Sequence, residues 1–410
     1  MIKRIAAFAG LPLIASLASF ALLPIIARVG GAPVWTALAL GQAIGAIAAI
    51  IVGLGWPLTG PAAVASSADE SVRRRHYAVS FATRSLTFLF TIPVMGVALY
   101  LAADSANFWL AFLMACAQAS SGLTPAWYCI ATGHPGRIAK YDVVPRMIAT
   151  LGVIPILLTT GHLLIYPAAL LVLGLAGTLF FNRRYARKED FAGLSFRSIL
   201  HEIWGLRAGA GVTVAAGSYA STPVIIVQLM LSTTGAAPFV SAEKLYRIGL
   251  LATAALGNSL QGWVSEFGGD HARRRKLSLA ALSGLGAVGW LLLAVAGPWA
   301  SALLFSAPLA PGFWTCFWFG LSFLLVCVTS STGPHWLVPA KRMRAVLTST
   351  VSGALVGIPA MIILAGLMGE AGGALGLALG EIVVTVIQLR VVLRLLRQPD
   401  ADNSSQQVAS

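Results

Sequence analysis

Three charged residues interrupt an apolar stretch near the middle of the chain. Glu243, Lys244 and Arg247 lie between the apolar segments 219–230 and 248–264. Ionised side chains are costly inside a bilayer, so they usually face a wet cavity or pair with one another. Glu243 and Arg247 have i, i+4 spacing and share a helix face, whereas Lys244 is turned away by about 100°. Two interpretations follow: a structural ion pair with a snorkelling lysine, or a cationic patch that faces an internal water-filled cavity.

Other charged residues lie near the ends of apolar segments. Arg28 follows the first segment, where it could snorkel to lipid headgroups or contact a diphosphate through its planar guanidinium. Arg84 lies where a later segment begins, and so does the i, i+4 pair of Asp142 and Arg146. These three residues are candidates for a cytoplasmic entrance, and they could equally be topology charges and helix caps.

Acidic residues are scarce in the apolar segments. Only Glu243 and Glu381 lie clearly inside one, where either could hold a proton or a coupling cation, or make a polar contact between helices. Because Glu243 has basic neighbours, the charge balance is positive, which favours an anionic substrate. The sequence carries no phosphate-binding loop, nucleophile elbow or zinc-type histidine pair, and its four cysteines are scattered. We therefore expect a protein that is not an enzyme and has no metal site or cofactor.

The elements that carry these residues are membrane-spanning helices. Hydrophobic residues make up 58% of the 410 residues and charged residues only 10%, against about a quarter charged in a soluble domain. The mean hydropathy is +0.83. Segments of about 20 apolar residues can cross a bilayer. We expect twelve such spans, over residues 5–27, 36–58, 83–103, 107–129, 144–163, 164–182, 207–230, 238–263, 277–297, 312–332, 345–367 and 373–395.

Basic residues alternate with the spans. Every Lys and Arg except Arg28, Lys244 and Arg247 lies before the first span, at or after the end of the last span, or in or beside every second connection. By the positive-inside rule these connections and both termini are cytoplasmic. The net charge of +14 therefore reflects membrane topology, not nucleic-acid binding. The connections on the other side are too short for an enzyme site, which argues against a glycan polymerase or ligase.

The chain divides into two similar halves. One pattern occurs over Leu23–Val34 and again over Thr222–Phe239. It consists of a proline with two branched residues, then a glycine, small residues and a second proline. An offset of about 200 residues, with an even number of spans in each half, predicts two parallel six-helix repeats. We expect an N-terminal lobe over 1–182, a cytoplasmic linker over 183–206, a C-terminal lobe over 207–397 and a disordered cytoplasmic tail over 398–410.

Three stretches resemble one family of membrane proteins. Leu123–Arg146 is similar to the polysaccharide flippases of the multidrug/oligosaccharidyl-lipid/polysaccharide exporter superfamily, which carry a proline, a Trp-aromatic pair, a glycine and a basic turn there. Leu23–Gly30 with Leu54–Pro61 resembles their opening helices, and Tyr219–Arg247 resembles the start of their second half. The family usually has Trp-Phe-aromatic-Gln-Gly here, whereas this chain has Trp-Tyr-Cys-Ile-Ala-Thr-Gly over Trp127–Gly133. The resemblance therefore does not define which sugars the substrate contains.

The resemblance implies an all-α polytopic membrane protein with twelve transmembrane helices in two pseudo-symmetric six-helix lobes around a central cationic cavity. It implies that an undecaprenyl-diphosphate-linked oligosaccharide, for O-antigen or exopolysaccharide, is flipped to the outer leaflet of the bacterial inner membrane by alternating access. The implied residues are Arg28, Lys244 and Arg247 for the diphosphate, and Arg84, Asp142 and Arg146 for the cytoplasmic entrance.

The expected partners are the lipid-linked oligosaccharide, membrane lipids and a polysaccharide polymerase or chain-length machinery, with no nucleic acid. We expect a monomer. Two alternatives stay open. One is an ion-coupled multidrug or cation exporter of the same superfamily, which would need Glu243 or Glu381 as the coupling acid. The other is a flippase for the peptidoglycan precursor.

Overall fold

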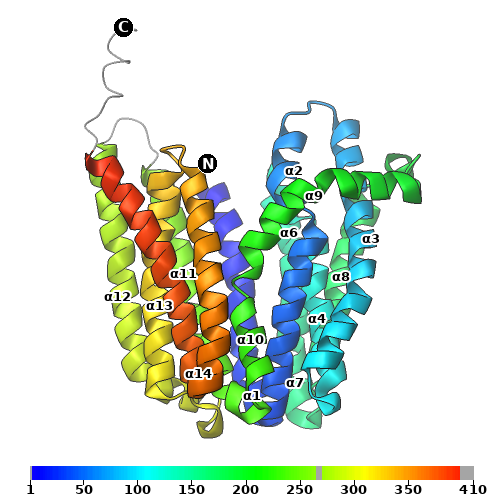
Figure 1. Ribbon diagram of the computed structural model, residues 1–410. Coiled ribbons are helices and arrows are strands. Elements are labelled where there is room, and N and C mark those ends of the chain that lie inside the picture. Colours follow the sequence, from blue (N-terminus) through cyan, green and yellow to red (C-terminus); the bar gives the residue numbers. More distant parts are fainter. Residues whose placement is uncertain (1, 265–269, 398–410) are drawn as a thin grey trace. The chain divides into compact units, whose positions relative to one another are not determined.

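The structure is a computed structural model that describes residues 2–264 and 270–397, with side chains except those of residues 2–19, 208, 209, 212, 215, 216 and 262. In these ranges the chain is helical and contains no strand (Figure 1). It forms two compact units, Met1–Ser241 with Ser301–Ala310, and Ala242–Ala300 with Pro311–Ser410. The lobe and linker boundaries from the sequence stay predictions, and the tail over 398–410 lies outside the described residues.

Two helices are too long for a single crossing. α1 (Ile2–Gly53) has 52 residues and α14 (Met343–Arg397) has 55, whereas about 20 residues span a bilayer. Each contains one glycine with non-helical torsions, Gly31 with φ 63° and ψ −166°, and Gly369 with φ 64° and ψ −140°. Glycine adopts positive φ without steric cost. Each helix therefore reverses at its glycine and supplies two spans (Figure 1).

Close contacts across α14 demonstrate the reversal. A Cβ atom on Gly353 would lie 2.9 Å from the carbonyl oxygen of Gly380, and one on Gly376 would lie 2.4 Å from the amide nitrogen of Met361. The Gln388 side chain donates to Ser349 Oγ at 3.1 Å across the same pair of segments. The two segments are antiparallel, and their backbones touch because the residues between them are small.

The remaining helices of the first unit follow in order. Its spans continue with α3 (Glu70–Ala102), the interrupted α4 (Phe108–Ala119), η2 (Ser120–Leu123) and α5 (Ala126–Ala131), then α7 (Val144–Thr160), α8 (Ile165–Tyr185), α9 (Phe196–Ser218) and α10 (Thr222–Met230). Short elements connect them: α2 (Trp56–Ala65), η1 (Ser105–Asn107), α6 (Pro135–Ile138), the π-helical turn η3 (Ala139–Val143) and η4 (Lys188–Phe191).

The second unit begins inside α11 (Thr233–Val264), because the boundary falls between Ser241 and Ala242. It continues with α12 (His271–Leu304), α13 (Phe313–Ser331), a second π-helical turn η6 (Thr332–Leu337) and α14. The last residues of α12 and the short η5 (Ala307–Leu309) belong to the first unit. Among the described residues, seven helical stretches are long and apolar enough to cross a membrane, by length and composition. Each of the twelve predicted spans coincides with a helical segment, so the predicted fold class is confirmed.

The basic connections of the first unit meet at one end. Arg75 Nη1 donates to the carbonyls of Asp190 and Ala192, both at 2.7 Å. The guanidinium carbon of Arg137 lies 4.2 Å from the ring centre of Tyr185. Connections that are far apart in sequence therefore share one face of the unit, as the positive-inside rule requires of cytoplasmic loops. Which face is cytoplasmic stays a prediction.

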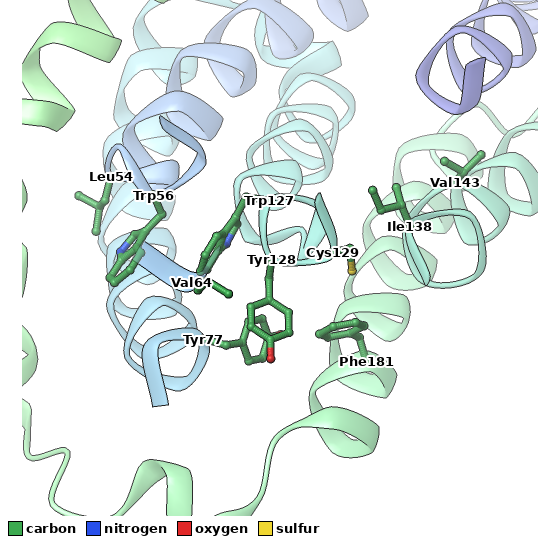
Figure 2. Close-up of a cluster of buried hydrophobic side chains, with 10 residues drawn as sticks. All are labelled: Leu54, Trp56, Val64, Tyr77, Trp127, Tyr128, Cys129, Ile138, Val143 and Phe181. Carbon is green, nitrogen blue, oxygen red and sulfur yellow. The ribbon is translucent and has the colours of Figure 1, made fainter. Parts of the chain in front are cut away.

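An aromatic cluster positions the short helix α5. Tyr77 of α3 lies 5.1 Å from Tyr128 and 5.4 Å from Phe181 between ring centres, and Trp56 lies 5.6 Å from Trp127 (Figure 2). A helix as short as α5 is not stable by itself. The rings contributed by α2, α3 and α8 surround its Trp-Tyr pair and hold it beside the interruption in span four.

Candidate anion-binding sites

Span four is interrupted between α4 and α5. Pro125 has no backbone N–H to continue the helix. Gly122 lies against the second segment of α1, where a Cβ atom would come 2.5 Å from the carbonyl oxygen of Ala49. An interruption inside a membrane helix frees backbone carbonyls, which neighbouring groups must then satisfy because water is absent. The interruption therefore requires a hydrogen-bond donor from another helix.

Arg84 of α3 is this donor. Its side chain is 0% exposed. Nη1 donates to the carbonyls of Gly122 and Thr124, both at 2.9 Å, and Nε donates to the carbonyl of Ser80 at 3.2 Å. These bonds use three of the five N–H groups of a guanidinium. Nη2 is buried with no hydrogen-bond partner, and within the described ranges Arg84 forms no ion pair.

A pocket of about 340 Å³ adjoins Arg84. Its wall is made mostly of small or apolar residues of the first unit, which are Ala49, Ile50, Gly53, Gly55, Pro57, Ser121, Gly122, Thr124, Ala126, Trp127, Ile130 and Thr213. The guanidinium carbon of Arg84 lies 5.9 Å from the Trp127 ring centre. A buried cation with two unused N–H groups at the wall of an apolar pocket matches an anionic group, above all a phosphate oxygen.

Arg146 of α7 also lies near the interruption, beside Gly174 of α8. Its Nε donates to Asp142 Oδ1 at 3.0 Å, and both side chains are about a fifth exposed. A Cβ atom on Gly174 of α8 would lie 3.8 Å from Arg146 Nη2 and 3.6 Å from Ser120 Oγ. Arg146 is therefore neutralised by Asp142, whereas Arg84 is not paired with a carboxylate. The role of all three residues at a cytoplasmic entrance stays a prediction.

Glu243, Lys244 and Arg247 form a charge cluster on α11 in the second unit. Arg247 Nε donates to Glu243 Oε1, and Lys244 Nζ lies 3.4 Å from Glu243 Oε2. Glu243 and Lys244 are 4% and 7% exposed. Helical spacing predicts that Lys244 points away from Glu243. In the structure its long side chain bends back to the Glu243 carboxylate instead. One carboxylate therefore meets two cations.

The other predicted site residues lie apart from these groups. Arg28, at the end of the first span, is exposed and its Nη2 donates to the backbone carbonyl of Leu303. Glu381 is buried in the second segment of α14. Arg28 belongs to the first unit, and Lys244 with Arg247 to the second. Their predicted grouping around one substrate therefore stays a prediction.

Sequence reasoning missed what Arg84 does. Its position at the start of a predicted span suggested a surface charge, because its partners are backbone carbonyls that lie 38 and 40 residues further on. One signal was present. Gly122 and Pro125 inside a predicted span indicate an interruption, and an arginine inside a neighbouring span is the type of donor that an interruption needs.

Comparisons with known proteins identify the fold. No family model and no curated protein matches the chain. An inward-facing multidrug resistance MATE family transporter of the MOP superfamily matches with a TM-score of 0.66 and 14% identity, over 97% of this chain and 100% of that one. The lipid II flippase MurJ in its inward closed conformation matches with a TM-score of 0.73 and 10% identity, over 94% and 87%. The eukaryotic MATE transporter AtDTX14 matches with a TM-score of 0.53 and 16% identity, over 96% and 95%.

These three structures share one fold with this chain. It is a fold of twelve transmembrane helices in two lobes. The chain is a multi-pass membrane protein with the fold of MATE and MurJ transporters.

Proposed function

We propose that the protein is a flippase for an undecaprenyl-diphosphate-linked oligosaccharide. It moves this lipid from the cytoplasmic to the outer leaflet of a bacterial inner membrane for O-antigen or exopolysaccharide assembly. The observation that carries the proposal is an excess of buried positive charge. Arg84 has no carboxylate partner in the described part of the chain, and two cations share Glu243. Such an excess attracts a diphosphate and repels a cationic drug.

The fold supports the same class of function. Its neighbours are named as transporters and a flippase. The lipid II flippase MurJ has a higher TM-score than the inward-facing MATE transporter, 0.73 against 0.66. A flippase for the peptidoglycan precursor is therefore the first alternative, and an ion-coupled cation exporter, as the multidrug MATE neighbour suggests, is the second.

In the proposed mechanism, arginine and lysine side chains hold the diphosphate while the lipid tail stays in the bilayer. Arg28, Lys244 and Arg247 are the contacts inferred from the sequence, and Arg84 joins them because its Nη2 is unused. Arginine suits this task because its planar fork donates two parallel hydrogen bonds to phosphate oxygens. The two lobes then alternate between states open to either side of the membrane, with both termini in the cytoplasm.

Flipping in vesicles tests the proposal. The full chain is reconstituted in liposomes that contain a fluorescent undecaprenyl-diphosphate-linked oligosaccharide, and a membrane-impermeant quencher reports the leaflet. We expect Arg247→Gln to lower the flipping rate about tenfold or more. The reason is that the variant loses one charge-assisted hydrogen bond to the diphosphate, and such a bond contributes about 1.5–3 kcal/mol. Arg342→Gln is the matched control, because Arg342 is an exposed cation of the second unit, and it should flip at the wild-type rate.

The alternatives predict different outcomes in the same vesicles. A cation exporter would carry a cationic dye along an ion gradient, would lose this transport in Glu243→Gln and would keep it in Arg247→Gln; that pattern would overturn the proposal. Flipping of the peptidoglycan precursor in preference to other lipid-linked glycans would assign the first alternative. Thermal unfolding of each variant in detergent separates lost transport from lost folding.

A further inference from the structure

A groove on the first unit lies between η3, α7 and α8, and neither Asp142 nor Arg146 lines it. Its volume is about 660 Å³, within the range of small-molecule pockets, about 300–1,000 Å³. Tyr141 and Gly177 both line it and lie in close contact, since a Cβ atom on Gly177 would lie 2.2 Å from the carbonyl oxygen of Tyr141. The rest of the apolar wall consists of Pro145, Ile148, Leu173, Ala176 and Phe180.

The basic end of this groove carries three cations. Lys140, Arg183 and Arg184 line it, and all three are exposed. None of them is ion-paired within residues 2–264 and 270–397. Asp142, the acid nearest to Lys140 in sequence, is paired with Arg146 at 3.0 Å. The groove therefore presents an uncompensated positive rim next to an apolar body.

The apolar body faces outward from the unit. Ile148 is 58% exposed and Phe180 is 64% exposed. In a membrane protein such side chains on spanning helices contact acyl chains. An occupant that satisfies both parts of the groove must combine a negatively charged head with a hydrocarbon tail. Basic pockets between transmembrane helices on the cytoplasmic side are known sites for anionic lipid headgroups.

We propose that this groove binds an anionic phospholipid, with its phosphate at Lys140, Arg183 and Arg184 and one acyl chain over Ala176 and Gly177 between α7 and α8. Charge complementarity selects an anionic lipid over a zwitterionic one. The apolar wall selects a lipid over free phosphate, which would leave the body of the groove empty. The site lies within the first unit and does not depend on which substrate the protein transports.

Lipid retention by the purified full-length protein tests the proposal. The protein in detergent is mixed with phosphatidylglycerol or with phosphatidylcholine, and bound lipid is counted by native mass spectrometry. We expect wild type to retain phosphatidylglycerol and not phosphatidylcholine. The triple variant Lys140→Gln, Arg183→Gln, Arg184→Gln should weaken retention of phosphatidylglycerol at least about tenfold, because each cation near a lipid surface attracts anionic headgroups.

Two further variants separate a site from general surface charge. Lys341→Gln, Arg342→Gln, Arg344→Gln is the matched control, because it removes the same charge from exposed positions of the second unit; it should retain the lipid as wild type does. Ala176→Trp fills the groove and keeps its cations, and it should lose the lipid. Unchanged unfolding midpoints without added lipid show that the variants are folded.

Four outcomes would overturn the proposal. The triple groove variant could retain phosphatidylglycerol as well as wild type does, or the control could lose as much lipid as the groove variant. Ala176→Trp could bind like wild type, which would exclude the groove body. Inorganic phosphate or undecaprenyl diphosphate could displace phosphatidylglycerol at equal concentration, which would assign the cations to free phosphate or to the transported lipid.

Discussion

At the scale of single residues, Arg84 supports the fold with some of its atoms and leaves others unused. Its Nη1 and Nε bind backbone carbonyls, whereas Nη2 has no hydrogen-bond partner. We predict that Arg84→Met lowers the free energy of unfolding, because each buried carbonyl left without a donor costs about 1–3 kcal/mol. Arg84→Lys should be intermediate, since lysine keeps the charge but not the planar fork.

Thermal unfolding in detergent, read together with flipping in vesicles, checks this prediction. Arg84→Met should unfold at a clearly lower temperature than wild type and should not flip lipid. If Arg84→Met unfolds at the wild-type midpoint, Arg84 does not stabilise the interruption in span four. If Arg84→Lys is as stable as wild type and flips normally, the free Nη2 has no part in binding.

Glu243 gives a second prediction at this scale. Replacing it with Gln leaves Lys244 and Arg247 close together without their shared carboxylate, and breaking a buried charge pair costs about 3–5 kcal/mol. We therefore expect lower stability in Glu243→Gln. We also expect tighter binding of undecaprenyl diphosphate, because both cations become available to the ligand. A binding titration on the purified variant measures this, and weaker binding than wild type would contradict the anionic-substrate proposal.

At the scale of helices, close packing of α1 on α4 is the clearest constraint. A Cβ atom on Gly41 would lie 2.3 Å from the carbonyl oxygen of Ala111, and one on Gly45 would lie 2.4 Å from that of Ala115. The four-residue spacing puts both glycines on one helix face, where small residues let backbones approach. We predict that Gly45→Ala destabilises the protein by about 1–3 kcal/mol through overpacking.

Gly152 in α7 provides the matched control for Gly45. A Cβ atom there meets nothing within 4 Å, so Gly152→Ala should stabilise the helix by about 0.5–1 kcal/mol through lower chain entropy. The opposite signs of the two substitutions are the expected result, measured as shifts of the unfolding midpoint. Two shifts of the same sign would mean that backbone contact between α1 and α4 is not the cause.

Much of the helical architecture could be predicted from the sequence, and the interruptions could not. Hydropathy alone places twelve spans, because a run of about twenty apolar residues is typical of a helix that crosses the bilayer. The interruption at Ser120–Pro125 depends on Arg84 and on the aromatic rings around α5, which only tertiary structure brings together. The single-residue reversals at Gly31 and Gly369 are likewise invisible in hydropathy. For the site, the Glu243–Arg247 pair follows from helical spacing, whereas the bond from Lys244 depends on side-chain bending.

At the scale of the whole molecule, topology is the property that labelling can measure. The four native cysteines are all buried, so we expect them to resist a membrane-impermeant maleimide applied to intact cells. Cysteine introduced at Ser105 should be labelled in intact cells. Cysteine at Ala68 or Arg342 should be labelled only after the membrane is opened. All three positions are exposed, and the expected difference follows from the positive-inside rule.

Two results would contradict this topology. Labelling of Ala68→Cys from outside would invert the first unit in the membrane. Labelling of Arg342→Cys from outside while Ala68→Cys stays protected would mean that the two halves do not run in parallel. The wild-type protein, whose cysteines should remain unmodified, is the control in both cases.

The π-helical turns η3 and η6 stand at opposite ends of their spans. η3 leads into α7, whereas η6 continues α13. A π-helical turn contains one more residue than the α-helical turn it replaces, so the side chains beyond it are rotated by about 100° relative to an uninterrupted helix. A helical periodicity that is counted across either turn therefore assigns the residues beyond it to the wrong face.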